Sequence, residues 1–199
     1  MLWQFRRELI AELQTKGEVV LSMPFVGHEE DFKKMGCKCI ETEVDRRGIN
    51  PKRDLKLLNF YRKLLKAEKP DMVITYSIKP NIYAGLACSM AGIPFCANVQ
   101  GLGTAFQRKG LALFVTALYK TALRKAKTVF FENEGNVKEF LDRKIIPQEK
   151  ITLLSGAGRL LFLGHCGFFR LGPCLFIRHG KPPQIIRYRI KISIAAPQQ

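Results

Sequence analysis

One continuous stretch, residues 70–103, constrains the fold more than any other part of the chain. It opens with a short apolar run, Met72 to Thr75, which is typical of a buried strand and is followed by a polar loop. Pro80 suits the first turn of a helix, and Gly92 suits its end. A second apolar run, Phe95 to Val99, then leads into a glycine-rich loop. The stretch is therefore predicted to form two parallel strands joined by a helix.

The loops after these two strands form the first candidate site, because ligands bind at the carboxyl ends of strands in open parallel sheets. Lys79 and Asn81 lie in the first loop, where an ammonium group and a helix N-terminus can hold a phosphate or sugar hydroxyls. Gln100, Gly101 and Gly103 form the second loop, where glycines allow a ligand close to the backbone. A helix cap with a solvated lysine and a plain tight turn are the alternatives without a ligand.

The same alternation of strand, helix and polar loop extends over residues 2–158 and predicts a Rossmann-like α/β fold with a parallel sheet. Helices are expected at residues 2–15, 28–35, 53–67, 80–91, 110–126 and 137–143, and strands at 18–23, 37–43, 72–75, 95–99, 128–131 and 150–154. Doubly wound sheets normally begin with a strand, so the first strand is expected to be missing here. Its neighbours, residues 18–23 and 72–75, would then pair with each other or leave ladder groups unpaired, which predicts marginal stability.

Basic charge is concentrated toward the C-terminal end. The formal net charge is +16, of which residues 159–199 carry +7, with seven Lys or Arg and no Asp or Glu. Such an excess favours anionic partners. Residues 159–199 follow neither the helical nor the strand period, so we interpret them as an atypical basic tail outside a domain of residues 1–158, for example a read-through in another frame. A membrane-surface hairpin is the alternative.

Several common catalytic and metal-binding patterns are missing from the sequence. The six cysteines show no CxxC spacing and have no nearby histidine at ligand spacing, so no metal site is expected. Cys88 and Cys96 fall on a predicted helix and strand, and we interpret them as small buried hydrophobes in a reduced, cytoplasmic compartment. No Ser-His-Asp set, Walker loop or carboxylate pair for hydrolysis is present, and no catalytic residue is assigned.

Six motifs, taken in order, resemble the N-terminal domain of the retaining family 4 glycosyltransferases, which have the GT-B fold. They are LWQFRRELI, DRRGINP, PDMVITYSIKPNIYAG, ANVQGLGTAF, VFFENEGNVKEFL and KITLLSGAG, and together they cover about residues 2–158. The bacterial transferases of capsule, exopolysaccharide and O-antigen synthesis are the most similar. The resemblance implies hexosyl transfer from a nucleotide sugar, such as a UDP-sugar, to a lipid-linked or saccharide acceptor, with no other cofactor and no nucleic acid.

The resemblance also implies that this chain is a truncated or frameshifted copy. In the family a first strand and its glycine-rich loop would precede Leu2, and Val-Asp and a whole donor-binding domain follow SGAG, where this chain continues with Arg159. We therefore expect an acceptor-side fragment that is inactive on its own. In several members a histidine at the position of Gln100 contacts the transferring sugar; Gln100 could donate a hydrogen bond there but could not carry a charge.

Three more charged residues are expected at the same cleft. Arg46 and Arg47 form a basic turn that could meet a pyrophosphate-linked lipid, although a solvated charge pair is commoner. Glu134 follows the strand at residues 128–131, together with Glu132 and Asn133, and helix capping is the stronger explanation for Asn133.

A different class of function is a non-catalytic basic module that binds an anionic membrane or nucleic acid. The predicted helix at residues 110–126 is apolar and then basic, so it suits a peripheral site at the inner face of the cell membrane as well as a core position. Nucleic acid ranks lowest, because the sequence contains no RNA-reading signature.

Overall fold

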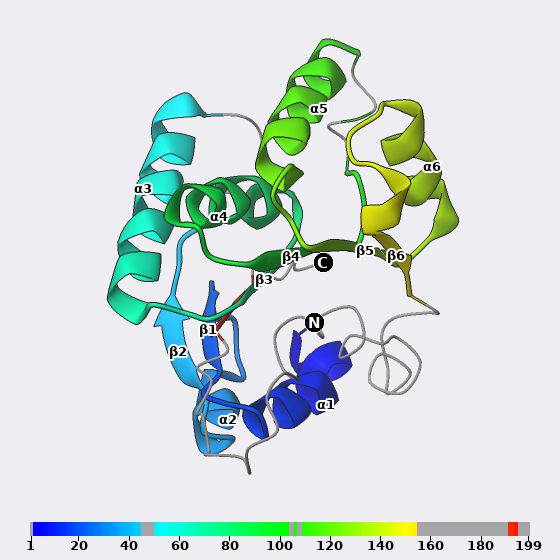
Figure 1. Cartoon of the computed structure of the whole chain (residues 1–199). Helices are drawn as coiled ribbons and strands as arrows, with labels where there is room; N and C mark the ends of the chain where they lie inside the picture. Colours follow the sequence, from blue (N-terminus) through cyan, green and yellow to red (C-terminus); the bar gives the residue numbers. More distant parts are fainter. Residues whose placement is uncertain (1, 45–49, 104–105, 107–108, 155–190, 195–199) are drawn as a thin grey trace, which may run out of the picture.

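The computed structural model describes residues 2–44, 50–103, 106, 109–154 and 191–194 (Figure 1). Its centre is a parallel sheet with the strand order β2-β1-β7-β3-β4-β5-β6. The strands are β1 Val20–Met23, β2 Lys38–Glu41, β3 Val73–Tyr76, β4 Phe95–Val99, β5 Thr128–Phe131, β6 Ile151–Leu153 and β7 Lys191–Ile194. The α-helices among these residues are α1 Leu2–Gln14, α2 Glu29–Lys34, α3 Pro51–Glu68, α4 Ile78–Ala91, α5 Lys109–Leu123 and α6 Glu134–Asp142. The predicted parallel Rossmann-like α/β fold is confirmed.

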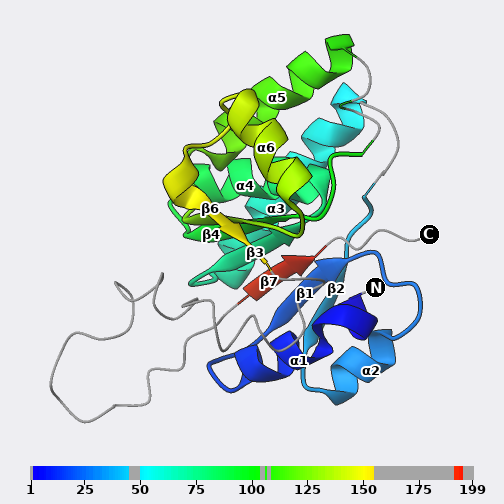
Figure 2. The ribbon, with the colours of Figure 1, turned by 90° about the vertical axis from the view of Figure 1, so that its right-hand side faces the viewer.

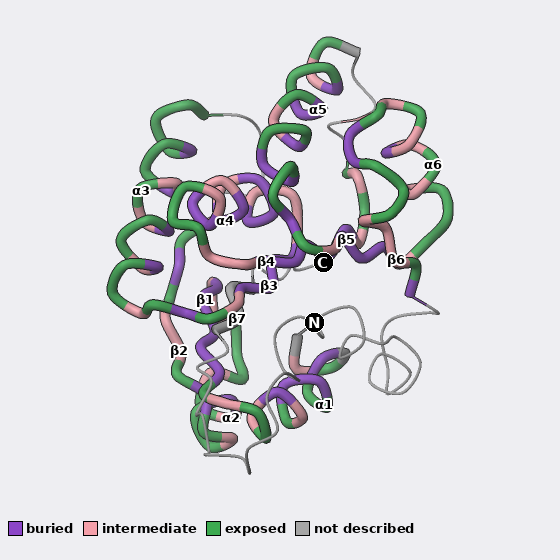
Figure 3. Tube along the Cα trace, viewed as in Figure 1, coloured by how far each residue is buried: buried purple, intermediate pink, exposed green. Residues whose placement is uncertain are grey.

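The helices cover both faces of the sheet, with α1 and α2 on one side and α3 to α6 on the other (Figure 2). The strands alternate accordingly, because successive side chains of a strand point to opposite faces. In β3, Val73 packs toward α3 to α6, whereas Ile74 packs toward α1 and α2. In β5, Phe131 packs toward α3 to α6, and Phe130 packs toward α1 and α2. Figure 3 shows the resulting buried layers along the sheet and the inner sides of the helices.

The centre of the sheet holds β7, which comes from the far end of the chain. Leu21 of β1 lies opposite Ile192, and Thr75 of β3 lies opposite Ser193, both in parallel register. The prediction that β1 and β3 pair with each other or leave ladder groups unpaired is therefore wrong, and so is the reason given for marginal stability. These four residues of the predicted tail belong to the sheet, whereas residues 159–190 and 195–199 lie outside the described part of the chain.

The cysteines predicted to be small buried hydrophobes lie in the core. Cys88 and Cys96 are buried and free, on α4 and β4 respectively. Burial raises the pKa of each thiol to about 12, because a thiolate would be poorly solvated there. Both side chains therefore stay protonated at neutral pH, which confirms the prediction for these two residues.

Candidate functional site

Five polar side chains from separate elements converge at the carboxyl ends of β3, β4 and β5. Tyr76 ends β3, Asn98 lies near the end of β4, and Gln100 and Glu132 follow β4 and β5. Arg6 reaches them from α1, on the face that α1 and α2 cover. We call these residues, Arg6, Tyr76, Asn98, Gln100 and Glu132, the strand-end cluster. Parallel strands bring their carboxyl ends to one edge, which is the usual ligand side of such a sheet.

Glu132 is the centre of the strand-end cluster. The Arg6 guanidinium donates a hydrogen bond to Glu132 Oε1 and forms an ion pair with it. Asn98 Nδ2 and Gln100 Nε2 lie 3.4 Å from the same oxygen and donate to it as well. The Arg6 side chain is 4 % exposed and that of Glu132 is 18 % exposed. A buried guanidinium needs such a counter-charge, so the pair neutralises Arg6 at the edge of the sheet.

Tyr76 and Asn98 complete the floor of the cluster. The Arg6 guanidinium carbon lies 5.6 Å from the centre of the Tyr76 ring, a cation–π contact. Burial raises the pKa of Tyr76 to about 12, and the nearby Arg6 charge only partly offsets it, so the phenol stays protonated at neutral pH. Asn98 Oδ1 is buried and has no hydrogen-bond partner in the described structure.

Lys79 is neutralised in a similar way by a carboxylate on another helix. Its Nζ lies 2.7 Å from Asp54 Oδ1 on α3, and the two side chains are 13 % and 6 % exposed. Asp54 Oδ2 also accepts a hydrogen bond from the backbone N–H of Asn50, before the first turn of α3. The alternative of a solvated lysine is therefore wrong, and Lys79 carries no uncompensated charge toward a ligand.

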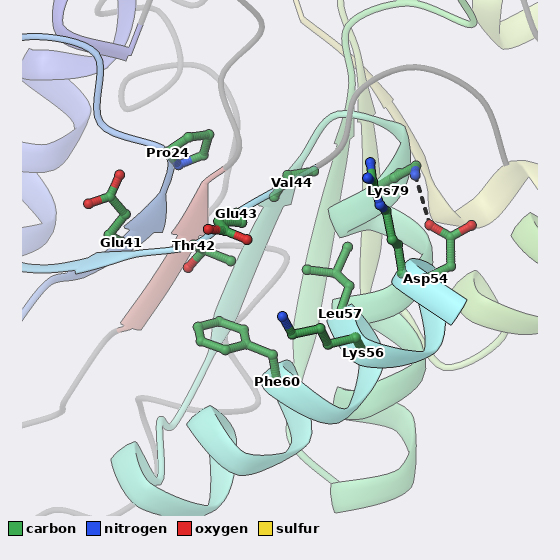
Figure 4. A pocket seen from close by; sticks show the side chains of 11 residues that line it. Pro24, Glu41, Thr42, Glu43, Val44, Asp54, Lys56, Leu57, Phe60 and Lys79 are labelled. Carbon is green, nitrogen blue, oxygen red and sulfur yellow. Dashed lines mark hydrogen bonds and ion pairs between the residues drawn. The ribbon is translucent and has the colours of Figure 1, made fainter. Parts of the chain in front are cut away.

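A cavity of about 1060 Å³ lies beside this ion pair, between the loop after β2 and helix α3 (Figure 4). Glu41, Thr42 and Glu43 line one side of it. Leu57 and Phe60 of α3 form an apolar wall opposite, and Figure 4 shows Lys79 at the rim with its contact to Asp54. The cavity thus combines carboxylates, cations and an aromatic ring at the same edge of the sheet. Among the described residues, no group of three or more His, Cys, Asp or Glu could hold a metal ion.

Comparison with known proteins identifies the chain's family. The sequence profile described as "Glycosyl transferase 4-like" matches residues 3–133. The chain belongs to the glycosyl transferase 4-like family. No curated protein sequence gives a significant match.

The similar solved structures are distant in sequence from this family 4-like chain. A putative UDP-N-acetylglucosamine 2-epimerase from Listeria monocytogenes is 18% identical, with a TM-score of 0.50 over 72% of this chain and 38% of that one. MurG from Acinetobacter baumannii is 20% identical, with a TM-score of 0.48 over 76% and 41% of the two chains. MnaA from S. aureus, in a structure with UDP, is 13% identical, with a TM-score of 0.48 over 71% and 44%. The chain spans less than half the length of each of these proteins.

The structure places Asn81 of this glycosyl transferase 4-like chain in the core. It is fully buried in the first turn of α4, where Thr75 Oγ1 donates to its Oδ1 at 2.7 Å. Its Nδ2 donates to the backbone carbonyl oxygen of Asn98 at 3.0 Å. Both amide atoms are thus used to tie β3, α4 and β4 together. This geometry favours a structural role for Asn81 over the predicted role in ligand binding.

The predicted glycine loop joins the strand-end cluster through Gln100. Gly101 is exposed, and a Cβ at this position would meet no atom within 4 Å. Gly103 has a φ of +60°, a backbone conformation that favours glycine. A Cβ at this position would also lie 3.2 Å from Ile78 Cδ1. Gly101 therefore leaves open space at the edge, whereas Gly103 shapes the turn.

In the acidic loop after β5, Asn133 caps the following helix and Glu134 is an exposed carboxylate. Asn133 Oδ1 accepts a hydrogen bond from the backbone N–H of Asn136 at 2.8 Å, which confirms the predicted helix cap. Glu134 is exposed in the first turn of α6, where its charge complements the helix dipole. Arg46 and Arg47, the other predicted cleft residues, lie outside the described residues.

Sequence reasoning missed Arg6, Asn98 and Asp54. A signal for Arg6 was available, because it shares the helical spacing of the buried residues Leu9, Ile10 and Leu13. A cation on an otherwise apolar helix face needs a buried partner. No comparable local pattern pointed to Asn98 or to the pairing of Asp54 with Lys79.

Proposed function

We propose that this chain is the acceptor-side domain of a glycosyltransferase of polysaccharide biosynthesis. In the whole enzyme, a hexosyl group would pass from a nucleotide sugar, such as a UDP-sugar, to a lipid-linked or saccharide acceptor held by this domain. The observation that carries the proposal is the family match over residues 3–133. The polar strand-end cluster and the neighbouring cavity supply hydrogen-bonding groups at the edge where an acceptor would lie. We propose no metal and no cofactor besides the donor.

We propose further that the chain is a fragment without turnover of its own. The similar solved structures are more than twice as long as the part that this chain covers. Glycosyl transfer needs the donor and the acceptor to be held together, because most of the rate gain comes from positioning and from charge stabilisation at the reacting centre. A single wall of such a site would bind one substrate and leave the other in solution.

The expected result is acceptor binding without donor binding or transfer. The full chain is titrated by fluorescence with polyprenyl diphosphate N-acetylglucosamine in detergent micelles and, separately, with UDP-glucose. Saturable binding of the lipid-linked sugar, with no binding of UDP-glucose below about 1 mM, supports the proposal. Product formation from radiolabelled UDP-sugars would contradict the fragment proposal, and binding of UDP-glucose alone would contradict the acceptor-side assignment.

We propose a peripheral contact with the inner face of the cell membrane, made by one side of α5. Leu113 and Phe114 are exposed near the start of this helix; Lys120 is exposed in its last turn, and Arg124 is exposed directly after its end. The opposite side, which includes Val115 and Tyr119, is buried in the core. Within the described residues, no helix is long and apolar enough to cross a bilayer. An apolar start and a basic end on one exposed stripe suit an anionic lipid surface.

Vesicle sedimentation tests this contact. The double variant Leu113→Ser/Phe114→Ser is expected to bind phosphatidylglycerol vesicles about tenfold more weakly, because two apolar side chains no longer enter the interface. Met90→Ser is the matched control, since Met90 is equally exposed but lies on α4. Equal binding by the double variant and the control would contradict the proposed contact. Vesicle binding without any binding of the lipid-linked sugar would instead favour the non-catalytic module.

A further inference from the structure

The strand-end cluster holds two acceptor oxygens to which none of the described residues donates a hydrogen bond. Within the described residues, Arg6, Asn98 and Gln100 all donate to Glu132 Oε1, and no donor contacts Oε2. Asn98 Oδ1 is the second such oxygen, on a side chain that is 2 % exposed. A buried acceptor without a donor is costly, and such groups in native structures commonly mark a ligand or an ordered water.

The amide orientation of Asn98 is fixed by its neighbour. If the oxygen and nitrogen were exchanged, the amide oxygen would face the carboxylate of Glu132 at 3.4 Å, and two acceptors would repel each other. Asn98 must therefore present its nitrogen to Glu132 and its oxygen elsewhere. Asn98 Nδ2 and Glu132 Oε1 are the atoms in contact, so the two unused oxygens belong to side chains that meet at the carboxyl ends of β4 and β5.

The charges around the cluster select the chemistry of this ligand. Arg6 is already paired with Glu132, and Lys79 is already paired with Asp54. A phosphate or carboxylate would bring further acceptors and negative charge toward Glu132, while both of these cations already have carboxylate partners. A second cation would lie close to the buried charge of Arg6. A neutral group that donates hydrogen bonds fits best, and hydroxyl groups are such donors.

We infer that Glu132 Oε2 and Asn98 Oδ1 bind hydroxyl groups of the acceptor saccharide, an inference that rests on the proposed function. Arg6 is a positioning residue, because its bond to Oε1 holds the carboxylate with Oε2 directed away from the internal donors. Gln100 steadies the same oxygen from the glycine loop. The open space at Gly101 lies on this loop, directly after Gln100.

The substitution Glu132→Gln separates this role from a structural one. The glutamine oxygen can keep the place of Oε1 and accept from the three internal donors, so the amide nitrogen takes the place of Oε2. An acceptor for the sugar hydroxyl thus becomes a donor with little change of shape. The matched control is Glu139→Gln. Glu139 lies on α6 and is paired with Arg143 at the end of that helix, so this change also removes a paired carboxylate but lies outside the cluster.

The test is saturation-transfer NMR on the full chain with the methyl glycosides of glucose, galactose, mannose, rhamnose and N-acetylglucosamine. At least one glycoside is expected to bind saturably, and Glu132→Gln is expected to weaken it about tenfold or more while Glu139→Gln does not. Arg6→Met is expected to weaken binding as well, and Arg6→Lys to restore part of it. Inorganic phosphate is expected not to compete.

Unchanged binding in Glu132→Gln, competition by phosphate, or no binding of any glycoside would overturn the inference. If Glu132→Gln does not fold, monodeoxy analogues of the glycoside that binds are compared on the unsubstituted chain. Removal of one particular hydroxyl should then weaken binding about tenfold, and equal affinity for every analogue would overturn the inference. Binding of the lipid-linked sugar is measured in a separate titration. If that sugar does not bind, the proposed function is contradicted, whereas the comparison of glycosides and variants still tests this inference.

Discussion

The variant Asp54→Asn is expected to lose about 3 kcal/mol of unfolding free energy, because it leaves the ammonium of Lys79 without its counter-charge. Both side chains are largely buried, so water can replace the lost partner only in part. The same change weakens the hydrogen bond from the Asn50 N–H at the start of α3. For a chain of this length the midpoint of thermal unfolding should fall by roughly 6–12 °C, measured by circular dichroism.

A double-mutant cycle attributes this loss to the ion pair. The double variant Asp54→Asn/Lys79→Met removes both charges and is expected to be more stable than either single variant, Asp54→Asn or Lys79→Met. Glu30→Gln, which breaks the exposed Lys33–Glu30 pair, is the matched surface control and should change stability by less than about 0.5 kcal/mol. If the midpoint of Asp54→Asn lies within about 2 °C of the parent, the loss of unfolding free energy is on the order of 1 kcal/mol or less. That result would show that the pair contributes little to stability.

The sequence was sufficient to locate the ligand edge of the sheet, but not the partners of its charged residues. Apolar runs that end in polar loops place Lys79 and Gln100 at the strand ends, and both lie there. The partner of Lys79 is 25 positions away, and the partner of Arg6 is 126 positions away. Such pairs depend on how helices pack across the sheet, and no local periodicity records that packing.

Asn81 shows a second limit of sequence reasoning. It was predicted to lie in a loop that faces a ligand, yet α4 already begins at Ile78. The first turn of the helix therefore carries Asn81 over the sheet, where it bonds to Thr75 and to the backbone of Asn98. A helix that starts two residues earlier than predicted thus places in the core a side chain that was expected to face a ligand.

The place of β7 could not be predicted from its own residues. Four residues are too short for a clear strand period, and they follow a segment without regular pattern. What sets their position is the sheet, because β1 and β3 each have an edge toward the centre and both pair with β7. Unpaired backbone groups at the centre of a sheet are costly when buried, so a strand from anywhere in the chain that reaches this position is stabilised there.

The variant Ile192→Pro is therefore expected to destabilise the chain by about 2–4 kcal/mol, since proline lacks the N–H that a central strand donates and leaves a buried group without a partner. The midpoint of thermal unfolding should fall by roughly 4–16 °C. Ile192→Val is the matched control, because it keeps the backbone N–H and should have a small effect. Hydrogen exchange at Leu21 and Thr75, which lie beside β7, should accelerate in the proline variant only. If both residues keep their protection and the midpoint is unchanged, β1 and β3 satisfy their backbone hydrogen bonds without β7. That result would contradict the stabilising role of β7 and favour the direct pairing of β1 with β3 that the sequence predicts.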